Sequence, residues 1–345
     1  MTSAFPSALM TTGIGSLPLE DAEQAAAFVL DAGLSIPFWP QLPRRDFREQ
    51  MIAQFAERMP CARIDAGEGR ISFDDGRKYE ELEPFYAAYL SGELDYFGLS
   101  AQAAAGLPAF EGLAAGRTWP IVKGQVTGPV TFSTSIASAD KAPLYGDADL
   151  RDAAVKLLAR HAQWQVRRLA PLASEKVLIF VDEPVLAAYG SSSYLGISEE
   201  DVWQMTGEIF EAIVESGGIT GMHVCGNSDW GVMLRTGVQV LNFDAYQYGS
   251  TVALYPEEVS ALFDRGGWIA WGIVPTGTAA DTETPGALAG RFEQCLDALA
   301  AKGLGPDLVR SRSLLTPSCG TGSIPPARAR KVFDLLRGLH AELAG

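Results

Sequence analysis

Short runs of apolar and β-branched residues alternate with longer amphipathic stretches along most of this chain. Such alternation is typical of β-α units, in which helices connect the strands of a parallel sheet. Eight runs are expected to be strands, near residues 9–15, 34–39, 119–124, 176–182, 218–224, 238–243, 268–274 and 312–317. Helical patterns occupy residues 20–32, 45–57, 149–173, 199–216, 256–265, 285–301 and 326–342. The pattern predicts an α/β fold, a single (β/α)8 TIM barrel.

We expect all 345 residues to belong to one barrel, because no internal repeat or disordered linker divides the chain. We therefore expect residues 1–345 to form one catalytic domain. The segment 58–118, between the second and third expected strands, is too long for a plain crossover. It is expected to be an insertion that adds a hairpin and helices over one end of the barrel.

Composition excludes several classes of protein. The formal net charge of −15, from 27 basic and 42 acidic residues, disfavours nucleic acid and anionic membranes as partners. The first basic residue is Arg44, so the cationic start of a secretory signal is absent, and no run of about 18 apolar residues predicts a membrane span. Four scattered cysteines do not form a disulfide framework, which favours the cytoplasm.

Polar residues stand where most of the expected strands end, and in TIM barrels these ends form the active site. They are Ser16, Gln41, Thr127, Asp182, Glu183, His223, Cys225, Asp244, Thr276 and Cys319. His223 and Cys225 are two residues apart, so their side chains face the same side of an extended strand. Cys319 follows the last strand, which neighbours the first in a closed barrel. One His, two Cys and a nearby carboxylate favour a tetrahedral zinc site.

The remaining reactive side chains have simpler interpretations. Cys61 and Cys295 lie on helix-like segments and are expected to be packing residues, and His161 is expected to be structural within a long helix. The GTGS segment 320–323 indicates either a tight turn or an anion-binding loop at a helix start. We favour the turn. Neither GxGxxG nor a P-loop is present, so a nucleotide cofactor is not expected.

Five motifs together resemble the catalytic, C-terminal barrel of cobalamin-independent methionine synthase, in that family's order. They are TTGIGSLP (11–18), VKGQVTGPVTF (122–132), VDEPVL (181–186), HVCGN (223–227) and TPSCGTGS (316–323). The wider group of barrels includes uroporphyrinogen decarboxylase and corrinoid-dependent thiol methyltransferases. The resemblance implies an enzyme of methionine biosynthesis, a methyltransferase that acts on the zinc-activated thiol of homocysteine.

The resemblance also implies a ligand set for one zinc ion per chain. The family's His-x-Cys pair falls on His223 and Cys225, and its late cysteine falls on Cys319. The family's glutamate ligand has no counterpart here. Asp244 is the nearest carboxylate and Gln247 the nearest match by spacing. The alternative for Asp244 is a helix N-cap or a solvated loop acid.

Other family positions imply how the amino acid is bound. Ile14, Gly15 and Ser16 match the stretch that holds the substrate carboxylate, and Asp182 matches the aspartate that contacts the amine. Gln41 stands where the family has a glutamate, so one negative charge is lost. Glu183 is interpreted as a general base, as a hydrogen-bond partner of a zinc ligand, or as half of a structural ion pair.

The expected methyl donor follows from the size of the chain. The full-length family enzyme has two barrels and holds a folate with help from the first, whereas this chain resembles the short, core-only relatives. An uncovered barrel admits a bulky donor, so we expect methylcobalamin or another methylated corrinoid as co-substrate, delivered by a corrinoid carrier protein, in place of folate.

Two other readings stay open. One is a corrinoid-dependent methyltransferase for another thiol, such as coenzyme M, although Ser16 and Asp182 favour an amino acid because coenzyme M has no amine. The other is a non-catalytic module that binds a metal or a corrinoid. Porphyrin decarboxylation is disfavoured, because it requires many cationic side chains and Arg44, Arg45 and Arg48 are the only early cluster.

Overall fold

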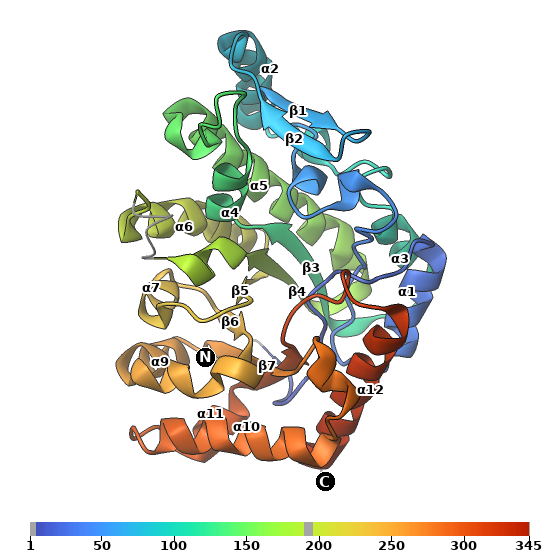
Figure 1. Cartoon of the computed structure of the whole chain (residues 1–345), viewed down its shortest axis with the longest axis vertical. Coiled ribbons are helices and arrows are strands. Elements are labelled where there is room, and N and C mark those ends of the chain that lie inside the picture. Colours follow the sequence, from blue (N-terminus) through green and yellow to red (C-terminus); the bar gives the residue numbers. More distant parts are fainter. Residues whose placement is uncertain (1–4, 190–195, 345) are drawn as a thin grey trace.

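A curled parallel sheet forms the centre of the structure, a computed structural model that describes residues 5–189 and 196–344 (Figure 1). Six strands lie in the order of the sequence, and each pairs in parallel with the next. They are β3 (Trp119–Thr127), β4 (Ala173–Asp182), β5 (Ile219–Val224), β6 (Val240–Phe243), β7 (Trp268–Val274) and β8 (Ser313–Pro317). All six coincide with expected strands.

The first two expected strands are not regular strands, and the count of eight is not observed among the described residues. Residues 9–16 and 36–41 instead make isolated parallel bridges, Thr11 with Leu315 and Phe38 with Lys123. Backbone hydrogen bonds continue from β8 to the first segment, on to the second, and from there to β3. Pro37 and Pro40 have no N–H group to donate, which interrupts a regular ladder. The fold is therefore a curled, TIM-barrel-like sheet with an irregular closing section.

Helices cover the outer face of the sheet at most of the expected places. They are α1 (Ala22–Asp31), α5 (Ala148–Leu169), α6 (Glu199–Glu215), α9 (Pro256–Asp264), α10 (Pro285–Ala300) and α12 (Pro326–Ala344). Four short helices, α4 (Pro129–Ser135), α7 (Trp230–Arg235), α8 (Ala245–Tyr248) and α11 (Pro306–Ser311), were not expected. No helix in the described part of the chain is long and apolar enough to cross a membrane.

The expected helix over 45–57 is wrong. That segment contains two 3-10 turns, Phe47–Glu49 and Ala53–Phe55. The Asp46 side chain caps the first turn, and Gln50 is extended (φ −67°, ψ 146°), so the helix cannot continue.

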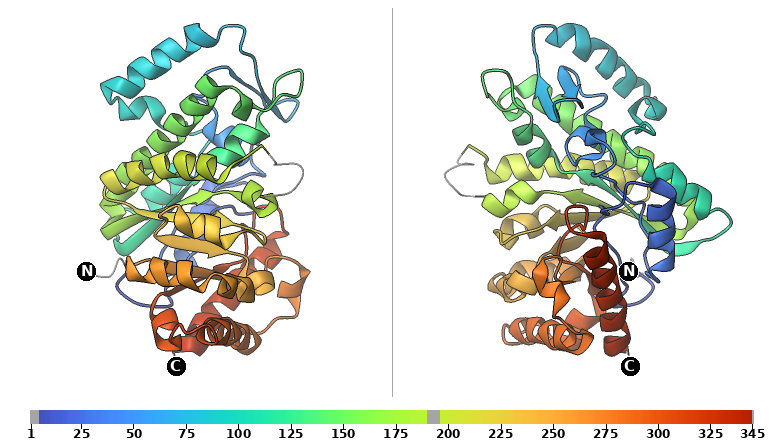
Figure 2. Two further views of the ribbon diagram at one scale, coloured as in Figure 1. Left: turned by 90° about the vertical axis from the view of Figure 1, so that its left-hand side faces the viewer. Right: turned by 45° about the vertical axis from the view of Figure 1, so that its right-hand side comes forward.

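The segment 58–118 contains an antiparallel hairpin and two α-helices. The hairpin pairs β1 (Ala62–Asp65) with β2 (Arg70–Phe73), and the helices are α2 (Lys78–Ser91) and α3 (Gly106–Leu113). In both views of Figure 2, the hairpin and α2 lie at one end of the molecule, and α10 lies at the other.

The inner face of the curled sheet changes character along its strands. Near their amino ends, the strands contribute a buried apolar cluster that includes Ile121, Leu178, Phe180, Ile219, Val240, Trp268 and Leu314. Alternation places the following inward residues on the same face. These are polar and buried, namely Lys123, Gln125, Asp182, His223, Asn242 and Thr316. The apolar layer therefore fills one end of the interior, and polar groups gather at the carboxyl ends.

Candidate metal and substrate site

Three potential metal ligands meet at the carboxyl ends of the strands. His223 lies near the end of β5, Cys225 follows that strand, and Cys319 follows β8. Their ligand atoms all lie within 4.8 Å of one another. One imidazole nitrogen and two sulfurs are the donor types that tetrahedral zinc prefers. These three side chains could therefore hold a metal ion, and their chemistry fits zinc.

Asn242 fixes the orientation of the His223 ring. The Asn242 Nδ2 atom donates to Ala270 O at 2.7 Å and to Thr316 Oγ1 at 2.8 Å, so its Oδ1 atom is the acceptor. That oxygen lies 2.5 Å from His223 Nδ1. Nδ1 must therefore donate a hydrogen bond to Asn242, and in the neutral ring Nε2 would be the nitrogen that binds a metal.

Electrostatics at the cluster favour one thiolate. Hydrogen bonding with Cys319 and His223 lowers the pKa of Cys225 to about 4, against the opposing effect of burial. The same contact with Cys225, together with burial, raises the pKa of Cys319 well above its usual range. Burial opposes a charge on His223, but Cys225 and Asp182 raise its pKa overall. One thiolate beside the His223 imidazole is therefore favoured in this pair.

Asp244 lies outside this cluster of three. It is the N-cap of α8, where Oδ1 accepts from the Gln247 backbone N–H at 3.0 Å and Oδ2 accepts from Gln247 Nε2 at 2.7 Å. The helix N-cap, the alternative considered for Asp244, is what the structure shows. Gln247, the other candidate for a fourth ligand, is engaged in the same contact.

A cavity of about 380 Å³ opens beside the three donors. His223, Cys225 and Cys319 line it together with four of the expected substrate-binding residues, Ile14, Ser16, Gln41 and Asp182. Gly15 lies between Ile14 and Ser16 in the chain and has φ +156°, a backbone conformation that residues with a side chain rarely adopt. The remaining lining residues are Pro43, Arg44, Glu49, Gln50, Met51, Pro184, Gly320, Gly322 and Ser323.

Asp182 lines this cavity and has one carboxylate oxygen without a hydrogen bond among the residues that the structure describes. The register of the sheet places it between Thr127 on β3 and His223 on β5. Its Oδ1 atom is buried and has no hydrogen-bond partner within the described ranges. Burial raises the pKa of Asp182 to about 6, and His223 and Lys123 oppose the rise. Burying a hydrogen-bond acceptor without a partner costs free energy. The Asp182 carboxylate is therefore suited to accept a hydrogen bond from a bound ligand.

The segment 14–16 is tied to the loop that carries Cys319. Ser16 Oγ accepts from the Gly322 N–H at 3.1 Å, and Ser16 O accepts from Thr321 N at 3.0 Å and Thr321 Oγ1 at 2.9 Å. Arg44 donates to the carbonyls of residues 322–324. The GTGS segment is thus a turn that positions Cys319 and Ser16, the reading favoured from sequence.

Glu183 does not line the cavity. Its carboxylate accepts from Val130 N, Thr131 N and Thr131 Oγ1 at 2.6–2.8 Å, at the N-terminus of α4. Burial raises the pKa of Glu183 to about 7. None of these contacts is an ion pair or a bond to a zinc ligand's side chain. Glu183 therefore has a structural role at the N-terminal end of α4, where backbone N–H groups stabilise a carboxylate.

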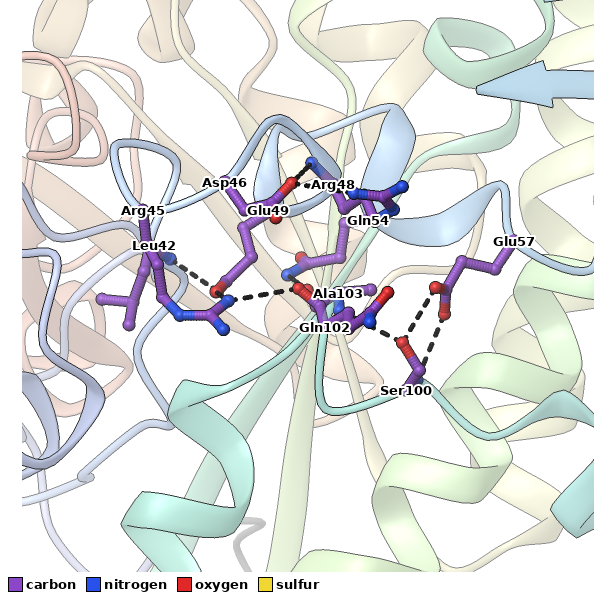
Figure 3. Close-up of polar contacts among 10 residues, drawn as sticks. All are labelled: Leu42, Arg45, Asp46, Arg48, Glu49, Gln54, Glu57, Ser100, Gln102 and Ala103. Carbon is purple, nitrogen blue, oxygen red and sulfur yellow. Dashed lines mark hydrogen bonds and ion pairs between the residues drawn. The ribbon is translucent and has the colours of Figure 1, made fainter. Parts of the chain in front are cut away.

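Two buried charged groups beside the site were not identified from sequence. Lys123 is completely buried, and its Nζ atom donates to Ile14 O at 2.5 Å and to Gln125 Oε1 at 3.1 Å. Burial lowers the pKa of Lys123 to about 7. Glu49 accepts from Arg45 Nη1 at 2.6 Å and Leu42 N at 3.1 Å (Figure 3). The sequence signal that could have identified Lys123 is a lysine within the otherwise apolar run 119–124.

The other singled-out residues are buried and away from the cavity. Cys295 lies on α10. Cys61 lies in a turn before β1, with φ 66°, and not on a helix as expected. His161 on α5 contacts Phe55 O at 3.3 Å, and burial lowers its pKa to about 4. All three fit the packing roles predicted for them.

Fold and site together define a TIM-barrel-like α/β protein with a candidate metal centre beside a cavity. The solved structures that resemble it include the following two. One, described as a B12-independent methionine synthase from Shewanella sp. W3-18-1 in complex with selenomethionine, has a TM-score of 0.58 and 12% identity over 98% of this chain and 98% of that chain. The other, a putative vitamin-B12 independent methionine synthase from Listeria monocytogenes, has a TM-score of 0.52 and 14% identity over 94% of this chain and 86% of that chain.

These two likenesses show a shared fold. Neither a protein-family model nor a curated protein sequence matches the chain.

Proposed function

We propose that this chain is a zinc-dependent methyltransferase that makes methionine from homocysteine. The observation that carries the proposal is the His223, Cys225 and Cys319 cluster, which lines one cavity together with Asp182, whose Oδ1 has no hydrogen-bond partner among the described residues. The two similar structures, described as a B12-independent methionine synthase and a putative one, support the same activity.

Zinc bound to these three side chains would deprotonate the substrate thiol and keep it nucleophilic. Asn242 holds the His223 ring through Nδ1, so Nε2 would be the metal ligand, and the turn of residues 320–323 holds Cys319. Three protein ligands leave the fourth position of a tetrahedral zinc for the substrate, as in catalytic sites. We therefore propose three protein ligands, without Asp244. Two thiolates and a neutral imidazole then give the zinc site no net charge.

The cavity also suits the amino-acid part of homocysteine. Asp182 is the proposed acceptor for the substrate ammonium group, since a charge-assisted hydrogen bond would satisfy its free oxygen. The residues Ile14, Gly15 and Ser16 are the proposed contact for the substrate carboxylate. Coenzyme M offers no amine to Asp182, so this geometry favours homocysteine.

The expectation of a corrinoid donor gains no support, and we do not propose it. Both similar structures carry names that exclude vitamin B12. The match covers 98% of the Shewanella chain, so a protein described as B12-independent has about the same extent as this chain. We propose methyl-folate as the donor and no corrinoid carrier protein as a partner.

The decisive experiment measures zinc content and methionine formation on the same purified protein. About one zinc per chain and homocysteine-dependent methionine formation are expected, with loss of activity after chelation and recovery on adding zinc. A protein that holds zinc but methylates no thiol would instead be a metal-binding module.

A further inference from the structure

The side chain of Gln41 stands where the resemblance places a glutamate, and the structure shows how its amide is oriented. Gln41 Nε2 donates to Gln54 Oε1 at 2.6 Å, and Gln54 Nε2 donates to Ala103 O at 2.6 Å. Gln54 is completely buried. Figure 3 shows the Gln54 side chain directed at Ala103, from the loop that precedes α3.

The direction of this chain of hydrogen bonds follows from its last member. Ala103 O is a backbone carbonyl and can only accept, so the group of Gln54 that faces it must be the NH2 group. Gln54 Oε1 then faces Gln41, so the Gln41 NH2 group must point at Gln54. The remaining Gln41 Oε1 has no hydrogen-bond partner among the described residues. A side chain that could otherwise present either end of its amide is therefore held as an acceptor.

The free oxygen lies next to the segment proposed to bind the substrate carboxylate. A Cβ atom added to Gly15 would lie 2.6 Å from Gln41 Oε1, and Ser16 and Gln41 form a β-bridge. Both Gln41 and Asp182 line the cavity. In an amino acid the carboxylate and ammonium groups share one carbon atom. An acceptor beside the carboxylate contact is thus placed for the ammonium group, which has three protons to donate.

We propose that Gln54 is a positioning residue that holds Gln41 Oε1 as an uncharged acceptor for the substrate ammonium group. Gln41 then supplies the second acceptor beside Asp182, although it lacks the charge of a glutamate. This inference rests on the proposed function. It assigns Gln41 as a group that, at the same site, distinguishes thiols with an α-amino group from thiols without one.

The test compares ligand binding by wild type, Gln54→Met, Gln41→Met and the double variant, all zinc-loaded. Calorimetry measures the Kd of homocysteine and of 4-mercaptobutanoate, which has the same thiol and carboxylate but no amine. Each single variant is expected to bind homocysteine about tenfold more weakly, the effect of one lost hydrogen bond. Neither should change the Kd of 4-mercaptobutanoate or the zinc content. Gln102→Met, an exposed glutamine close to Ala103, is the matched control and should bind both thiols as wild type does.

The double variant separates positioning from a general structural effect. Gln54 acts only through Gln41, so Gln41→Met combined with Gln54→Met should bind homocysteine no more weakly than Gln41→Met alone. Unchanged homocysteine binding in Gln54→Met, equal weakening for both thiols, or additive losses in the double variant would each overturn the proposal. If Gln54→Met does not fold, Gln41→Met still tests the acceptor, with the two thiols compared. Wild type that binds homocysteine but forms no methionine would instead contradict the proposed function alone.

Discussion

The Oδ1 atom of Asn242 lies 2.5 Å from Nδ1 of His223, across neighbouring strands β6 and β5. Asn242 is itself fixed by Ala270 O and Thr316 Oγ1, which leaves it only an acceptor to offer the imidazole. Asn242 therefore fixes the orientation of the ring and leaves Nε2 as the nitrogen that would bind a metal.

Replacing this asparagine should weaken zinc binding without removing a ligand. In Asn242→Leu the imidazole loses the acceptor that fixes its tautomer, so zinc affinity is expected to fall about 10- to 100-fold. Competition with a zinc-binding dye measures the affinity. Thr251→Val, which removes a hydroxyl that contacts Trp230 elsewhere in the fold, is the control and should leave affinity unchanged. Equal affinities in Asn242→Leu and wild type would show that the contact does not orient a ligand.

Zinc content should separate the three cluster residues from Asp244. Thiolates are strong ligands for zinc, so Cys225→Ser and Cys319→Ser are each expected to lose most of the metal. Asp244→Ala should keep about one zinc per chain, since both its oxygens are already bonded to Gln247. Atomic absorption on purified proteins gives the ratio. Loss of zinc from Asp244→Ala would make it a fourth ligand after all.

Most of the fold could be predicted from sequence, because six strands are apolar runs bounded by polar or turn residues and their helices are amphipathic. The two segments that failed as strands contain Gly13, Gly15, Pro37 and Pro40, which disrupt a regular ladder while leaving the segment in place. The 45–57 pattern is amphipathic, but the extended backbone of Gln50 divides it. Periodicity detects which face is buried and does not detect such a local break.

The site could be predicted as far as it depends on strand ends. His223, Cys225 and Cys319 come together because parallel strands end at one edge. The roles of Glu183, Lys123 and Gln54 depend on contacts between segments far apart in the chain, which no local pattern contains. Glu183 in particular follows Asp182 directly, yet neighbouring residues of a strand face opposite sides of the sheet, and only Asp182 lines the cavity.

The buried carboxyl of Glu49 should make stability depend on pH. Burial raises the pKa of Glu49 from 4.5 to about 7, although Arg45 opposes the rise. The folded state therefore binds the Glu49 proton more tightly than the unfolded chain does. The stability that this protonation contributes is fully present below pH 4.5 and is lost as the pH rises through about 7. Relative to Glu49→Gln, the free energy of unfolding of wild type should fall by at most about 1.4 kcal/mol per pH unit in that window. Urea unfolding between pH 5.5 and 8 measures it.

The surface variant Gln102→Met serves as the control for this pH series, and its curve should run parallel to that of wild type. Parallel curves for Glu49→Gln and wild type would mean that Glu49 does not titrate between pH 5.5 and 7.

Asp182 is expected to matter for the amino acid and not for the metal. Asp182→Asn replaces a charged acceptor by a neutral one, so KM for homocysteine should rise about 10- to 100-fold, the usual effect of losing a charge-assisted hydrogen bond. Zinc content should stay near one per chain, because Asp182 is not a member of the ligand cluster. Steady-state kinetics with metal analysis on the same preparation measures both. Lost zinc with unchanged KM would assign Asp182 to the metal site.

The methyl donor is the last expectation, and two co-substrates distinguish the alternatives. The cavity of about 380 Å³ is lined by the candidate zinc ligands and, among others, by Pro43, Arg44, Glu49, Gln50 and Met51. If the chain shares the B12-independence named for the two similar structures, methyl-folate should support homocysteine-dependent methionine formation, and methylcobalamin should not. Mass spectrometry of methionine made from a deuterated methyl donor measures both rates. Cys319→Ser should abolish transfer from either donor, because the thiol would no longer be activated. Transfer from methylcobalamin alone would reverse the donor assignment and leave the zinc-thiolate chemistry in place.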